Sequence, residues 1–190
     1  MYEVEVKVRA DHDRVRAALA ASDASLLGTV RQVDTYYDAP HRDFAATDEA
    51  LRIRREVTEG VETTTVVTYK GPLVEAESKT REEIETPIDS VEEVDAILSA
   101  LGFEVASTVE KERERWSLED YHVTLDDVAG LGEFVEVEAT AEAEADIVSV
   151  REGALDLLRS LGLDPDAQIG TSYLGLLMSS ERTEGDEEDL

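Results

Sequence analysis

The sequence predicts an α+β protein with helices and about eight antiparallel strands that close into a barrel or tunnel. Strand-like segments fall into two groups, each finished by a helix, which differs from the regular alternation of a doubly wound sheet. Several strands carry charged side chains at every second position, with valine or isoleucine between them. Because successive side chains point to opposite faces of a strand, these segments have one ionic and one apolar face.

The first group of elements opens on an alternating strand over residues 1–9. Asp11 is the kind of residue that caps a helix, and an Ala-rich helix is expected to follow it. Glu59-Gly60 predicts a hairpin turn, Gly71-Pro72 is expected to break the chain, and Ser90 caps the closing helix. The expected ranges are helix 11–21, strand 26–38, loop 39–48, strands 50–57, 63–70 and 78–86, and helix 90–102.

The second group repeats this plan in outline. Strands are expected near residues 103–118, 121–128 and 132–140, followed by a helix over 145–161 and a short helix over 172–180. Residues 1–180 are predicted to form a single domain. Seven charged residues within 181–190 predict a disordered acidic tail.

The charge balance excludes some partners. A net charge of −28 argues against nucleic-acid binding, because phosphate backbones require a basic footprint. Acidic residues are spread along the whole chain, and the basic residues are mostly arginine. This composition is typical of proteins adapted to high salt, where a dense acidic surface maintains solubility. We therefore expect a halophilic, archaeal-type protein.

Cysteine is absent, so any bound metal must be held by oxygen ligands or by the three scattered histidines. Carboxylates are plentiful, and they favour hard divalent ions such as Mg²⁺, Mn²⁺ or Ca²⁺. The chain shows no apolar run of membrane-spanning length and no signal segment at its start. We expect a cytoplasmic protein without a membrane partner.

Half of the 18 basic residues lie on strands with an ionic face. Cross-strand ion pairing on an ordinary surface sheet would explain one such strand. Agreement among five strands favours a cavity lined by charge, in which lysine and bidentate arginine side chains grip phosphate oxygens. The basic residues concerned are Lys7, Arg9, Arg52, Arg54, Lys70, Arg81, Lys111, Arg113 and Arg115.

Eight ordered motifs resemble the CYTH superfamily, the triphosphate tunnel metalloenzymes, over nearly the whole chain. They are Glu3-x-Glu5-x-Lys7, Asp34-Thr-Tyr-Tyr-Asp38, Leu51-Arg52-Ile53-Arg54, Tyr69-Lys70-Gly71-Pro72, Arg81-x-Glu83-x-Glu85, Lys111-x-Arg113, Leu125-Asp126, and Gly132-x-Phe134-x-Glu136-x-Glu138. The resemblance implies an eight-stranded antiparallel tunnel with helices packed outside. It also implies a triphosphate substrate, Mg²⁺ or Mn²⁺ as cofactor, and a homodimer.

Carried over position by position, the resemblance assigns roles to individual residues. The phosphate ligands would be Lys7, Arg52, Arg54, Lys70, Arg81, Lys111 and Arg113. The metal ligands would be Glu3, Glu5, Asp126, Glu136 and Glu138, with Glu83 or Glu85 assisting. Lys7, Arg113 and Glu136 are expected to act in catalysis. Asp34 is expected to serve as a turn or salt-bridge residue, and Tyr173 to lie near the tunnel mouth.

Three activities fit these motifs. In a class IV adenylate cyclase, the ribose hydroxyl of ATP attacks the α-phosphorus and pyrophosphate leaves. In a triphosphatase, water attacks a terminal phosphorus of inorganic, thiamine or nucleoside triphosphate. A noncatalytic polyphosphate-binding module would need fewer carboxylates. The Tyr69-Lys70-Gly71-Pro72 segment and the chain length resemble the cyclase branch, although Met1-Tyr2 replace the His-Phe element that some cyclases carry.

Overall fold

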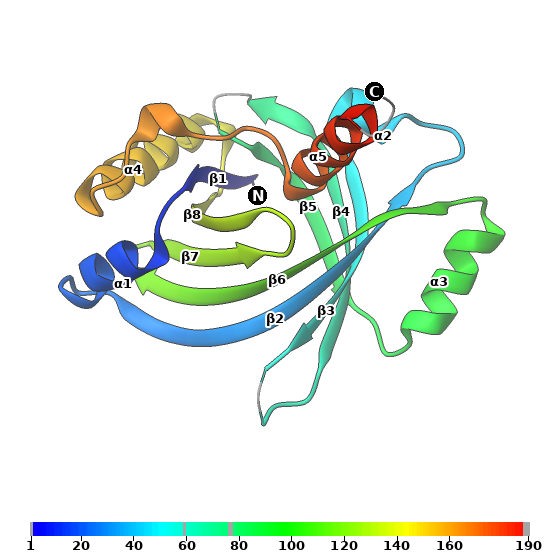
Figure 1. The fold of residues 1–190 in the computed structure, drawn as a ribbon, viewed down its shortest axis with the longest axis horizontal. Coiled ribbons are helices and arrows are strands. Elements are labelled where there is room, and N and C mark those ends of the chain that lie inside the picture. The colour runs from blue at the N-terminus through cyan, green and yellow to red at the C-terminus, as the bar shows by residue number, and fades with distance from the viewer. Residues whose placement is uncertain (1, 59, 76–77, 188–190) are drawn as a thin grey trace.

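The computed structural model describes residues 2–58, 60–75 and 78–187, which form one closed antiparallel barrel (Figure 1). Around the barrel the strands follow the order β1-β5-β4-β3-β2-β6-β7-β8. The predicted fold class is therefore confirmed. The strands are β1 (Tyr2–Arg9), β2 (Ser25–Asp38), β3 (Ala50–Val57), β4 (Thr64–Glu75), β5 (Thr80–Pro87), β6 (Glu104–Leu118), β7 (Tyr121–Val128) and β8 (Gly132–Ala141).

The helices lie outside the strands (Figure 1). They are α1 (His12–Ala20), α2 (Phe44–Thr47), α3 (Val91–Ala100), α4 (Ile147–Ser160) and α5 (Tyr173–Glu187), with short 3₁₀ turns η1 (Glu144–Asp146) and η2 (Pro165–Ala167). Two predicted caps are confirmed. The Asp11 side chain accepts a hydrogen bond from the backbone N–H of Arg14, and the Ser90 side chain accepts one from that of Glu93.

Two local expectations were wrong. Gly71-Pro72 does not end its strand, because a register shift between Lys70 and Leu73 absorbs both residues and β4 continues to Glu75. The predicted loop over 39–48 contains α2. Residues 181–187 of the predicted tail belong to α5, which continues to Glu187. Residues 188–190 of that tail lie outside the described residues.

The main hydrophobic core lies on the outer face of the barrel, not inside it. Valines of β1 and β8 point outward and pack against Leu19 of α1 and Leu158 of α4, both fully buried. A fully buried leucine contributes about 1.5–3 kcal/mol relative to an exposed one. Because α1 and α4 cover the apolar face, the alternating glutamates and lysine of β1 must point into the barrel.

The segment after α4 returns to one end of the barrel. Tyr173, at the start of α5, packs with Val109, Val128 and Phe134 in a second core cluster. The rings of Tyr173 and Phe134 meet edge to face, with their centroids 5.0 Å apart. In the described part of the chain, no helix is long and apolar enough to cross a membrane.

Candidate functional site

The barrel encloses a cavity of about 740 Å³. Its wall includes every predicted phosphate ligand and four of the five predicted metal ligands. Those residues are Lys7, Arg52, Arg54, Lys70, Arg81, Lys111 and Arg113 together with Glu3, Glu5, Glu136 and Glu138. They come from six strands, and alternation along each strand turns them to the same interior. Predicted ligand Asp126 is fully buried but does not line the cavity.

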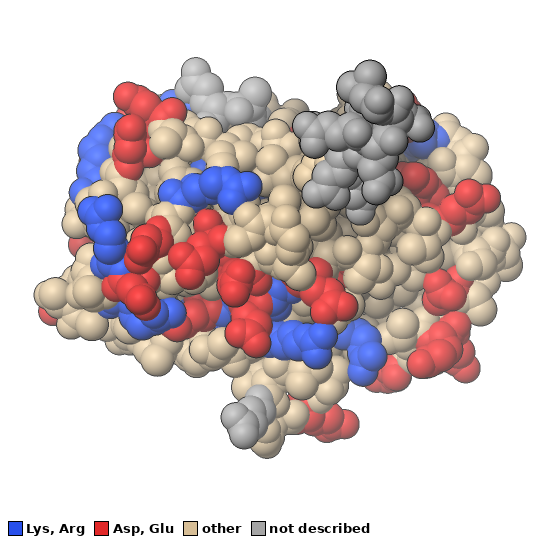
Figure 2. Space-filling model, in the orientation of Figure 1, with Lys and Arg blue, Asp and Glu red and all other residues tan. Residues whose placement is uncertain are grey.

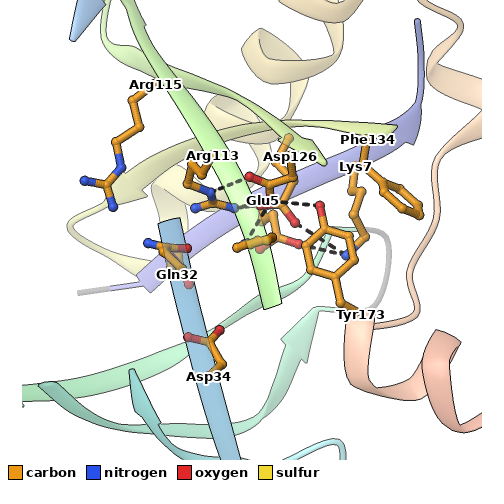
Figure 3. A network of polar contacts seen from close by, with 12 residues as sticks. Glu5, Lys7, Gln32, Asp34, Arg113, Arg115, Asp126, Phe134 and Tyr173 are labelled. Atoms are coloured by element: carbon orange, nitrogen blue, oxygen red, sulfur yellow. Dashed lines mark hydrogen bonds and ion pairs between the residues drawn. The ribbon is translucent and has the colours of Figure 1, made fainter. Parts of the chain in front are cut away.

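Asp126 holds two of the cations in place (Figure 3). Its carboxylate accepts hydrogen bonds from Arg113 at 2.6 Å through both Nε and Nη2, and from Lys111 Nζ at 2.8 Å. The Tyr173 hydroxyl donates a further bond at 3.0 Å. Burial alone would raise the pKa of Asp126, but Arg113 and Lys111 outweigh it and hold the pKa well below its usual range. Asp126 is therefore an ionised anchor for cations in this structure.

Lys111 loses its proton at a lower pH than an exposed lysine does. Burial and the neighbouring Arg113 outweigh Asp126 and Glu136, and they lower the pKa of Lys111 to about 8. Its Nζ also lies 4.8 Å from the centre of the Tyr173 ring, and that of Lys7 lies 4.3 Å from the same centre. Tyr173 therefore contacts both lysines and Asp126.

A second anchor, Asp34, holds the arginines of β3. Arg54 donates two hydrogen bonds of 2.6 Å to the Asp34 carboxylate, and Arg52 donates one of 3.3 Å. Asp34 therefore serves as the expected salt-bridge residue. Burial would raise the pKa of Asp34, but Arg52 and Arg54 lower it well below its usual range. Paired donors with a fixed fork geometry are also what bidentate phosphate recognition requires.

Lysines of β1 and β4 lie between pairs of glutamates. Lys70 Nζ is 3.0 Å from Glu3 and 2.8 Å from Glu83, and Lys7 Nζ is 3.5 Å from Glu5 and 3.6 Å from Glu136. Arg113 also donates to Glu136. Each cation of this set is therefore neutralised by carboxylates of the barrel itself.

Glu83 and Glu85 differ in their surroundings. Burial would raise the pKa of Glu83, but a hydrogen bond with Glu3 and the charges of Lys70 and Arg52 lower it to about 2. Glu85 accepts a hydrogen bond of 2.8 Å from the Thr68 hydroxyl. Glu83 thus belongs to the ion-pair network of the cavity.

Glu138 is the least compensated of the predicted metal ligands. Burial raises its pKa to about 7; the charge of Arg113 opposes this, while nearby Glu3, Glu136 and Glu5 add to it. A divalent cation at this position would remove that repulsion, and carboxylate oxygens are suitable ligands for hard divalent ions. As they stand, no three carboxylate or imidazole side chains among the described residues are arranged to hold a metal ion. Glu3, Glu5 and Glu136 are instead paired with lysine or arginine.

The sequence reasoning missed several charged residues of the cavity wall, among them Lys79 and Asp48. Lys79 stands two positions before Arg81, so strand periodicity already indicated that it shares the face of Arg81. It is also one of only four lysines in the chain. Asp48 follows α2 in the segment expected to be a loop, and only the fold brings it near β5.

Arg115 lies outside the cavity wall, although it shares a strand face with Lys111 and Arg113. It donates hydrogen bonds of 2.9 and 2.5 Å to Glu56, which also accepts one from Gln32. Figure 3 shows Arg115 pointing away from the Asp126 cluster. On the outer face shown in Figure 2, acidic and basic side chains are interspersed without a continuous basic patch.

Comparison with known proteins gives relatives over nearly the whole chain. A protein of Methanocaldococcus jannaschii with the provisional name adenylate cyclase is 38% identical over 177 residues, covering 93% of this chain and 98% of the relative. Adenylate cyclase CyaB of Aeromonas hydrophila is 31% identical over 182 residues, covering 94% and 90%.

Solved structures share the fold. A protein from Pyrococcus horikoshii superposes with a TM-score of 0.88 at 37% identity, covering 94% of this chain and 99% of that one. A Hippeastrum protein, whose structure was described as revealing a dominant triphosphatase activity, superposes with a TM-score of 0.64 at 19% identity, covering 94% and 95%. The CYTH domain model matches residues 1–173, from the opening strand to Tyr173. With its charged, closed barrel and these relatives, the chain belongs to the CYTH domain family.

Proposed function

We propose that this protein is a metal-dependent enzyme that acts on a triphosphate, as a class IV adenylate cyclase converting ATP to cyclic AMP and pyrophosphate. The observation that carries the proposal is the convergence of the predicted phosphate ligands in one cavity of a protein with a net charge of −28. Burying so many cations costs free energy unless anions compensate them. A triphosphate is the small anion that best matches this group of lysine and arginine side chains.

In the proposed mechanism, the substrate replaces the barrel's own carboxylates. Phosphate oxygens take hydrogen bonds from Arg52, Arg54 and Lys70, while Asp34 keeps the two arginines oriented. Arg113 and Lys111 are already oriented by Asp126, so they can meet a second phosphate group without reorganisation. Lys7 then neutralises charge on the group that leaves.

Substrate binding would also release glutamates for the metal. Once phosphate oxygens pair with Lys7 and Lys70, the side chains of Glu5 and Glu3 lose their present partners. We propose that Glu3, Glu5, Glu136 and Glu138 then hold Mg²⁺ or Mn²⁺. A divalent ion supplies Lewis-acid stabilisation of phosphate charge. Asp126 remains a predicted ligand, although Lys111, Arg113 and Tyr173 occupy its oxygens in the structure.

The cyclase proposal is supported by the names of the two relatives, at 38% and 31% identity. The alternative is a triphosphatase that hydrolyses inorganic, thiamine or nucleoside triphosphate. It is favoured by the Hippeastrum protein, in which the same fold accompanies a dominant triphosphatase activity. The cytoplasmic location, the halophilic character, the homodimer and the lack of nucleic-acid binding remain predictions.

Product identification distinguishes these activities. The purified protein is incubated at several salt concentrations with ATP, tripolyphosphate or thiamine triphosphate, each with Mg²⁺ or Mn²⁺. Cyclic AMP with pyrophosphate supports the cyclase, and orthophosphate supports the triphosphatase. Binding without turnover identifies a noncatalytic module. Glu136→Gln is expected to abolish turnover, and full activity in that variant would refute the proposed site.

A further inference from the structure

The barrel is closed unevenly on the two sides of β1. Its pairing with β8 runs along the whole strand, from Tyr2 to Arg9. On the other side, among the residues that the structure describes, one register pair, between Glu3 and Arg81, joins β1 to β5. Further contacts at this β1–β5 seam come from residues next to the paired strands, Lys79 among them.

Two backbone hydrogen bonds complete the seam. The carbonyl of Glu5 accepts from the N–H of Lys79 at 3.1 Å, and the carbonyl of Lys7 accepts from the N–H of Ile169 at 2.7 Å. A second cavity, of about 250 Å³, lies here. It shares Glu5, Lys7, Lys79 and Gly170 with the main cavity, so the two cavities adjoin at the seam.

Lys79 is a buried cation at the border of these cavities, with its side chain 9% exposed. The other three lysines lie close to buried or half-buried carboxylates. Lys79 instead pairs with Asp48 at 3.3 Å, and Asp48 also pairs with Arg81 at 3.0 Å. Burial and the charge of Arg81 lower the pKa of Lys79. The carboxylate of Asp48 thus contacts two buried cations, while the charge of Glu5 also acts on Lys79.

The position of Asp48 resembles that of a bound anion. Its Oδ2 atom lies between Lys79 Nζ and Arg81 Nη2, at hydrogen-bond distance from each. Its side chain is 40% exposed, so it can leave without opening the core. A phosphate oxygen at the same place would receive the same two donors and carry more charge.

We propose that Lys79 and Arg81 form a subsite at the β1–β5 seam for a compact phosphate anion split from the substrate, and that Asp48 occupies this subsite until the anion displaces it. The inference rests on the proposed function, which supplies the anion. A cyclase would deliver pyrophosphate, and a triphosphatase would deliver orthophosphate. The adjoining cavity provides room for this anion beside the tunnel.

Calorimetric titration with pyrophosphate and, separately, with orthophosphate tests the subsite at constant ionic strength. Lys79→Met should weaken binding of the preferred anion about tenfold, the size expected for a lost hydrogen bond to a charged group. Asp48→Asn should tighten binding about three- to tenfold, because a competing anion is removed. Tighter binding cannot result from a folding defect.

The matched control is Asp38→Asn, which removes a charge from an exposed residue of the same cavity wall. Its affinity should stay within about twofold of the wild type. If Asp48→Asn and Asp38→Asn tighten binding equally, or if neither Lys79→Met nor Asp48→Asn changes it, the subsite is refuted while the tunnel proposal stands. If the wild type binds neither tripolyphosphate nor ATP, the proposed function fails and the subsite fails with it.

Discussion

Asp126→Asn tests whether the buried charge network holds the barrel together. Asp126 accepts hydrogen bonds from Lys111, Arg113 and Tyr173, and it is fully buried. Breaking a buried ion pair by removing one partner costs about 3–5 kcal/mol, because the remaining charge loses its compensation. Arg113 keeps Glu136 as a partner, so we expect the lower end, about 3 kcal/mol. For a protein of this size that corresponds to a fall in melting temperature of about 6–12 °C.

Urea unfolding at pH 7, followed by circular dichroism, measures this loss. The control is Asp127→Asn, an exposed neighbour on the same strand, which should change stability by less than about 0.5 kcal/mol. Because the folded-state pKa of Asp126 lies well below its usual range, its ionised carboxylate stabilises the folded protein at every pH above the unfolded-state pKa. This stabilisation is lost as the pH falls through the folded-state pKa. The difference between wild type and variant should therefore persist at pH 5. Equal urea midpoints for the two variants, or a difference that vanishes at pH 5, would refute the reasoning.

Three further predictions concern charge, packing and substrate. With chelator present, Glu138→Gln should raise the melting temperature at pH 8 but not at pH 4. The pKa of Glu138 is raised to about 7, so at pH 8 the buried carboxylate is charged and destabilises the fold, whereas at pH 4 it is protonated and neutral. An equal effect at both pH values would contradict this assignment. Leu158→Ala should cost about 2–5 kcal/mol in urea unfolding, and Val148→Ala on the exposed face of α4 should cost much less; similar losses would argue against packing by α4. Lys7→Ala should weaken tripolyphosphate binding at least about tenfold in calorimetry, and unchanged affinity would remove Lys7 from the site.

Strand periodicity explains why so much of the site was predictable. The alternation of Glu3, Glu5 and Lys7 with valines determines that these side chains share one face, whatever the rest of the fold. Periodicity does not determine which face lies inside. That depends on α1 and α4, whose leucines cover the valine face and leave the charged face to the interior.

The roles of individual carboxylates were less predictable. Asp126 and Glu136 both lie on strands and looked alike as metal ligands. In the fold, only Glu136 lines the cavity, whereas Asp126 lies behind Lys111 and Arg113 and orients them. The difference arises from the bonding partners that the neighbouring strand and Tyr173 provide, and no local pattern encodes them.

The sequence by itself determined that several strands carry one charged and one apolar face, because alternation along a strand is a local property of the chain. It also indicated most of the cations that line the cavity, although it missed Lys79 and included Arg115, which lies outside the wall. Only the tertiary structure decided which carboxylate each cation meets, and that Asp48 reaches Lys79 and Arg81. These features depend on contacts between residues far apart in the chain, and such contacts exist only after the barrel has closed.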